Sequence, residues 1–165
     1  MQILMTFRGK IASQPPGDGF ASILVIDDGV GVTEFSPREA LCVVKGQNFV
    51  SSPSGVCKPW FFPETGHGTM MARVISSLSP KAHILVVRTD TGLRDAYKSF
   101  SEALDWCIMR RANIVCIGMA FGAFSSGKNP DLRSPYEAVG AGITVLMPVL
   151  EPSMGDLADQ SFFTD

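Results

Sequence analysis

Four short, uninterrupted apolar runs constrain the fold of this chain more than any other feature of its sequence. A strand buried on both faces has a continuous apolar run, whereas a strand with one solvated face alternates apolar and polar residues. The runs therefore predict inner strands of a parallel sheet, at residues 23–26, 83–87, 114–117 and 143–146. A fifth candidate strand at 41–44 is followed by Gly46 and a second short run at 48–50.

Helical patterns separate these runs. Across residues 93–108 apolar side chains recur at steps of three and four, with charged residues on the other face, which is typical of an amphipathic helix. A shorter helix is expected over 69–78, and a third one near 135–140, with Ser134 as its N-cap. The residues of the 69–78 helix expected to face inward are Met71, Val74, Ile75 and Leu78.

The alternation of strands and helices predicts the fold class. It implies right-handed crossovers and a sheet covered on both faces, that is, a three-layer α/β/α fold with a mainly parallel sheet. Residues 15–17 (Pro-Pro-Gly) mark an N-terminal arm, and 51–63 form a long loop rich in Pro, Ser and Gly. No repeat or linker divides the 165 residues, so we expect a single domain over 1–165.

Composition excludes several classes of protein. Hydrophobic residues make up 45% and charged residues 18% of the chain, which argues against intrinsic disorder. The net charge is −2, so the sequence lacks the excess of basic residues that is typical of nucleic-acid-binding proteins. No apolar run is long enough for a signal peptide or a membrane span, and the four cysteines lack metal-ligand spacing. We expect a cytoplasmic chain with reduced thiols, no metal, no cofactor, and neither nucleic acid nor membrane as a partner.

Two side chains are placed where chemistry gathers in parallel sheets, at the carboxyl ends of the strands. Asp27 directly follows the run at 23–26, and His67 lies between two glycines just before the 69–78 helix. If they meet, the carboxylate accepts the Nδ1–H of the imidazole and leaves Nε2 free to act as a base. Spacing alone leaves non-functional alternatives open: Asp27 would then only cap a turn, and His67 would only have a structural role.

The same residues carry a resemblance to a known family. Residues 25–29 (Val-Ile-Asp-Asp-Gly) resemble the aspartate motif of the subtilisin-like serine peptidases. Residues 67–72 (His-Gly-Thr-Met-Met-Ala) resemble the histidine motif of that family, usually His-Gly-Thr-His-Val-Ala. Weaker similarities follow the family order at 46–50, 104–107, 117–122 and 142–145, so the resemblance spans roughly residues 20–150.

The resemblance implies a partial subtilisin-like fold and a serine endopeptidase activity. Asp27 would orient His67, which would be the general base and then the general acid. Ala120, Phe121 and Gly122 would form an edge segment that pairs with the backbone of a peptide or protein substrate, a form of β-augmentation. No cofactor is implied.

Several positions depart from the family pattern. Asp28 stands where the family usually has Ser or Thr, and Met70 replaces the second histidine of the histidine motif. Glu151 occupies the position of the oxyanion-hole Asn. An ionised carboxylate cannot donate a hydrogen bond, and losing one such donor costs about 10²–10³ in turnover.

The nucleophile is the largest departure. The family serine lies roughly 150 residues after the histidine, but only 98 residues follow His67, and none of them form a Gly-Thr-Ser motif. Ser153 is the nearest similar position, and we interpret it as a loop serine. We therefore expect a peptidase domain truncated before its nucleophile and inactive as given. The cut would expose a sheet edge and apolar faces, which predicts self-association or a partner that covers them.

Two alternative functions stay open. The chain is alternatively a degenerate pseudoprotease that acts as a peptide-binding or regulatory module. It is also compatible with a nucleotide-binding α/β domain, because residues 122–128 fit the pattern G-x-x-x-x-G-K that cradles phosphates. Asn129 follows Lys128 where that motif needs Ser or Thr for Mg²⁺.

Overall fold

A six-stranded sheet forms the centre of the protein. The computed structural model describes residues 3–7, 21–50, 58–89, 96–118 and 135–149. The strands lie in the order β1-β6-β5-β2-β4-β3; β2 to β6 are parallel, and β1 is antiparallel to β6. The expected mainly parallel sheet is thus confirmed. The strands are β1 (Ile3–Phe7), β2 (Ser22–Asp27), β3 (Val43–Asn48), β4 (His83–Arg88), β5 (Ile114–Ile117) and β6 (Thr144–Val149).

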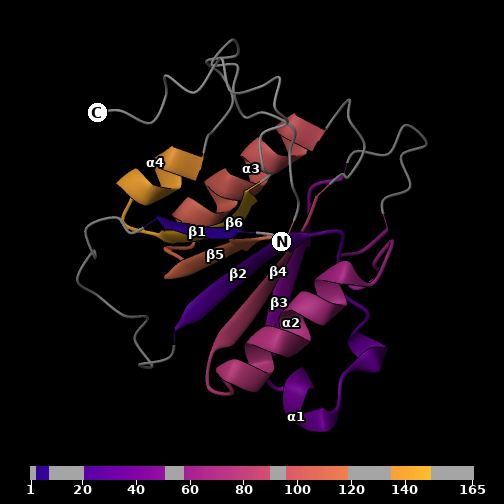
Figure 1. The fold of residues 1–165 in the computed structure, drawn as a ribbon. Helices are drawn as coiled ribbons and strands as arrows, with labels where there is room; N and C mark the ends of the chain where they lie inside the picture. The colour runs from indigo at the N-terminus through magenta and orange to yellow at the C-terminus, as the bar shows by residue number, and fades with distance from the viewer. Residues whose placement is uncertain (1–2, 8–20, 51–57, 90–95, 119–134, 150–165) are drawn as a thin grey trace.

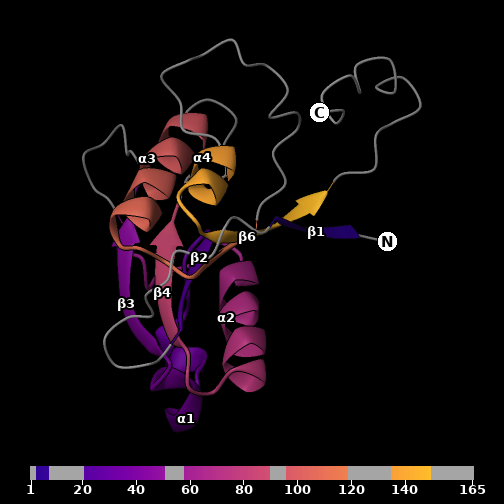
Figure 2. The ribbon, with the colours of Figure 1, turned by 90° about the vertical axis from the view of Figure 1, so that its left-hand side faces the viewer.

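Helices cover both faces of this sheet, as the alternating pattern predicts. Helices α1 and α2 lie on one face and α3 and α4 on the other, which gives three layers (Figures 1 and 2). None of these helices, in the part of the chain that is described, is long and apolar enough to cross a membrane. Their bounds are α1 (Pro37–Ala40), α2 (His67–Leu78), α3 (Ala96–Met109) and α4 (Pro135–Gly140), with a 3-10 turn at Val32–Glu34.

The central strand β2 explains why its sequence is an uninterrupted apolar run. Leu24 and Ile26 pack with α3 and α4, whereas Val25 packs with Ala72 of α2 on the opposite face. The side chains of Leu24, Val25 and Ile26 are all fully buried. Period-2 alternation sends successive residues to opposite faces, and here both faces are covered.

Helix α2 differs from the expectation in its buried face. Val74 and Leu78 are 51% and 80% exposed, so placing them inward was wrong, although Met71 and Ile75 do pack against the core. The buried positions of α2 are Gly68, Thr69, Ala72 and Ser76. Small residues let the helix approach the sheet closely, and a search for large apolar side chains does not detect such a face.

The strands at the sheet edges also differ from expectation. One strand, β3 (Val43–Asn48), takes up the second half of the run at 41–44 and only the first residue of the run at 48–50. Leu41 precedes it with 80% of its surface exposed. Strand β1 was not expected; it pairs with β6, with Ile3 opposite Val149, so the sheet ends at β1 on this side and not at β6. The expected features at 15–17, 51–57, 93–95 and Ser134 lie outside the described residues.

Three cysteines allow a test of this packing. Cys42, Cys107 and Cys116 are free and buried, and burial raises the pKa of the Cys107 thiol strongly and that of Cys116 to about 11. After Cys57, which lies outside the described residues, is replaced by serine, we expect the native chain to be inert to Ellman's reagent at pH 8. All three thiols should react in guanidinium chloride. Rapid reaction of any thiol without denaturant would contradict the described core.

Candidate acid–base site

The candidate site lies at the carboxyl end of the central strand. Strand β2 leads to α1 on one face of the sheet, whereas β4 and β5 lead to α3 and α4 on the other. Such a change of side between neighbouring strands opens a crevice at their carboxyl ends, where ligands bind in open α/β sheets. Asp27 is the last residue of β2 and therefore lies at this end of the sheet.

Asp27 and His67 meet there, although 40 positions separate them in the sequence. The His67 Nδ1 atom lies 2.8 Å from Asp27 Oδ2. The Asp27 side chain is 2% exposed, whereas that of His67 is 44% exposed. The structure thus joins a buried carboxylate to an imidazole that is open to solvent.

The second oxygen of Asp27 is also engaged. Its Oδ1 accepts the backbone N–H of Asp28 at 2.8 Å, so the carboxylate cannot rotate freely. Burial raises the pKa of the Asp27 carboxyl above its ordinary value, and the hydrogen bonds from the Asp28 amide and the His67 ring act in the opposite direction. The carboxylate depends on these donors to stay ionised in a dry site.

The carboxylate also fixes which nitrogen of His67 carries a proton. An ionised carboxylate only accepts, so Nδ1 must donate, and in the neutral ring Nε2 is then left as an acceptor. Among the described residues none forms a hydrogen bond with Nε2. As far as the described residues go, Nε2 is open to a proton donor on a bound molecule.

Glycines make room for this arrangement. A Cβ atom on Gly118, just after β5, would overlap Asp27 Oδ2 and lie 3.3 Å from His67 Cε1. A Cβ atom on Gly68 would overlap the carbonyl oxygen of Gly29. Sequence reasoning treated Gly118 only as part of a strand similarity and missed its role, for which a glycine directly after a buried strand was the available signal.

The other residues expected at the site are not brought to it by the described structure. Ala120, Phe121, Gly122, Glu151 and Ser153 lie outside the described residues, as does the 122–128 loop with Lys128. In the described ranges, no group of three or more His, Cys, Asp or Glu residues is placed to hold a metal ion. The dyad of Asp27 and His67 is therefore the candidate site.

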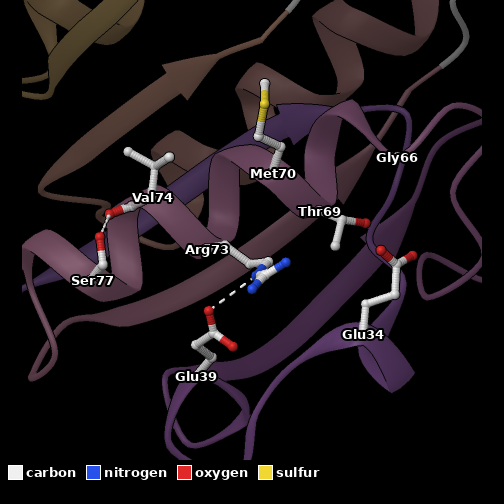
Figure 3. Close-up of a pocket in the computed structure, with 8 residues that line it drawn as sticks. All are labelled: Glu34, Glu39, Gly66, Thr69, Met70, Arg73, Val74 and Ser77. Atoms are coloured by element: carbon white, nitrogen blue, oxygen red, sulfur yellow. Dashed lines mark hydrogen bonds and ion pairs between the residues drawn. The ribbon is translucent and has the colours of Figure 1, made fainter.

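A shallow depression lies on the other side of the start of α2. It runs between α1 and α2, and Arg73 reaches across it so that its Nε donates to Glu39 Oε1 at 3.0 Å (Figure 3). Neither member of the dyad lines it. The lining residues are Glu34, Glu39, Gly66, Thr69, Met70, Arg73, Val74 and Ser77.

The fold and the site together define the class of this protein as an α/β chain with a carboxylate–imidazole dyad at the end of its central strand. Comparison with protein-family models and with curated proteins finds no match.

Proposed function

We propose that this chain supplies the acid–base part of a subtilisin-like serine endopeptidase domain. The observation that carries the proposal is the 2.8 Å contact between His67 Nδ1 and the buried Asp27 carboxylate. The two residues come from a strand end and a helix start and follow the Asp, His order of that family's triad. The residues around them carry the motif similarities at 25–29 and 67–72.

The dyad has the properties that acyl transfer needs. His67 Nε2 would take the proton of a serine hydroxyl as that oxygen attacks the peptide carbonyl, and would then give the proton to the leaving amine. The resulting imidazolium would be stabilised by the buried Asp27 carboxylate, which stays ionised throughout. The peptide would lie beside residues 120–122, in the pairing that the family resemblance implies.

The nucleophile in this proposal is a serine beyond residue 165, and the test begins there. We expect the coding sequence to continue past Asp165 into a Gly-Thr-Ser-x-Ala motif. The protein from that longer reading frame should react with a fluorophosphonate probe at the serine of the motif. His67→Ala should abolish labelling, because the serine then has no base.

The second histidine of the chain provides a matched control. His83 begins β4, opposite Ser22 at the amino end of β2, so it lies at the far end of the sheet from the dyad, and His83→Ala should keep the label. Labelling that survives His67→Ala would overturn the proposal. A stop codon directly after Asp165 would favour the peptide-binding module instead, and labelling of the 165-residue chain at Ser153 would show that the nucleophile lies within it.

A further inference from the structure

We propose that Asp28 is a positioning residue that holds the backbone on both sides of His67, so that the imidazole is presented to Asp27. This inference rests on the proposed function, since the group that is positioned is the proposed base. Asp28 is the residue that departs from the Ser or Thr of the family resemblance. Its side chain is buried and points toward the start of α2, not toward the imidazole.

One carboxylate collects the hydrogen-bond donors around His67. Asp28 Oδ2 accepts the backbone N–H of Thr65 at 2.5 Å and its hydroxyl at 2.6 Å. Asp28 Oδ1 accepts the backbone N–H of Gly68 at 3.3 Å. The Thr65 hydroxyl in turn accepts the backbone N–H of His67 at 3.2 Å. The amides of residues 65, 67 and 68 thus converge on Asp28, directly or through one hydroxyl.

The start of α2 needs such an acceptor. The first N–H groups of a helix have no partner within the helix, and the residue before α2, Gly66, has no side chain to accept them. Asp28, which directly follows β2, accepts these hydrogen bonds in place of an N-cap side chain. A negative charge beside a helix N-terminus is also electrostatically favourable.

Asp28 is suited to this role in a way that Ser or Thr is not. A carboxylate has two oxygens with about four acceptor sites, so it reaches Thr65 and Gly68 together, whereas a hydroxyl offers one oxygen. Burial by itself raises the pKa of the Asp28 carboxyl, but the hydrogen bonds from Thr65 and Gly68 outweigh burial and hold the pKa below its ordinary value of 3.8. Asp28 is therefore ionised at neutral pH.

Arg88 fixes the point from which the Asp28 side chain starts. Its Nε donates to the backbone carbonyl of Asp28 at 3.1 Å, and its Nη2 donates to Glu64 Oε1 at 2.8 Å. Glu64 directly precedes Thr65 in the sequence. Arg88 therefore binds both the backbone of Asp28 and the residue next to Thr65, that is, the two segments that the Asp28–Thr65 hydrogen bonds join. The position of His67 is thereby tied to β2 and β4.

The test compares Asp28→Asn with Asp27→Asn in the ¹⁵N-labelled chain. In Asp28→Asn, one acceptor oxygen replaces two, so the amides of Thr65 and Gly68 should exchange with solvent at least about tenfold faster, as expected for the loss of a hydrogen bond to a charged group. The low-field Nδ1–H signal of His67 should broaden. In Asp27→Asn that signal should disappear, while the protection of Thr65 and Gly68 is retained.

The two variants separate failure of this inference from failure of the proposed function. Unchanged exchange at Thr65 and Gly68 in Asp28→Asn would overturn the role of Asp28, whatever Asp27→Asn does. An unchanged His67 signal in Asp27→Asn would overturn the dyad and hence the proposed base.

Thr65→Val and the longer reading frame extend the test. Should Asp28→Asn fail to fold, Thr65→Val removes only the hydroxyl link and should speed exchange of the His67 amide selectively; no change there would count against the inference. In the protein encoded by the longer reading frame, Asp28→Asn should lower kcat for peptide hydrolysis with little change in KM. A purely structural residue would not separate the two parameters in this way. Equal loss in both parameters would contradict positioning.

Discussion

Replacement of Arg88 by methionine should lower the free energy of unfolding by about 3 kcal/mol. The guanidinium is 2% exposed and donates to the backbone carbonyls of Asp28 and Lys58 at 3.1 and 3.0 Å, and to Glu64 at 2.8 Å. Methionine keeps the apolar stem but leaves both carbonyls without their donor, and each such group costs about 1–3 kcal/mol. The Glu64 carboxylate is 43% exposed, so solvent screens its share of the effect.

Urea denaturation followed by circular dichroism measures this change. Arg73→Met is the matched control, because Arg73 also pairs with a glutamate, Glu39, but is 53% exposed. Its unfolding midpoint should stay close to that of the parent. Equal midpoints for Arg88→Met and Arg73→Met would mean that the buried network around Arg88 does not hold the segment that leads to His67.

On the proposed function, Asp27→Asn should lower peptidase turnover about 10⁴-fold in the protein encoded by the longer reading frame, the loss expected when the acid that sets the histidine tautomer becomes an amide. The geometry gives the reason. Asp27 Oδ1 accepts the Asp28 N–H, so the single oxygen of asparagine would keep that bond and turn its NH₂ group toward His67 Nδ1. Nδ1 would then have to accept, and the proton would move to Nε2, where the base is needed.

The tautomer is read directly from the ¹⁵N shifts of the His67 ring in the 165-residue chain. Gly118→Ala is a steric version of the same experiment, since the added Cβ would displace the carboxylate without changing its charge. Gly140→Ala is its control, because a Cβ at Gly140 meets no atom within 4 Å among the described residues. A ring that keeps its proton on Nδ1 in Asp27→Asn would disprove the geometric argument.

The inner strands were predictable because burial on both faces leaves a local mark in the sequence. β5 matches the predicted run at both ends, and β2, β4 and β6 begin or end within a few residues of theirs. Strand β1 was not predictable in this way. Its partner β6 is more than 130 residues away in the sequence, and nothing in residues 3–7 records that pairing.

The candidate site shows the same division. Asp27 and His67 were singled out because a strand end and a helix start are readable from local patterns, although spacing alone left a turn-capping acid and a structural histidine open. Asp28 was noted only as a departure from a motif, and Arg88 was not singled out at all. Their importance lies in hydrogen bonds across 24 to 60 positions, and no local pattern reports contacts between residues so far apart in the sequence.

The sequence by itself determined the α/β class and the succession of inner strands and helices along the chain, and it placed Asp27 at a strand end and His67 at a helix start, because periodicity and strand ends are properties of neighbouring residues. Only the tertiary structure decided which face of α2 is buried, that Gly118 must lack a side chain, and that Asp28 and Arg88 hold His67 in place. These features depend on side chains from distant segments that occupy the same space, and packing of that kind exists only once the sheet has formed.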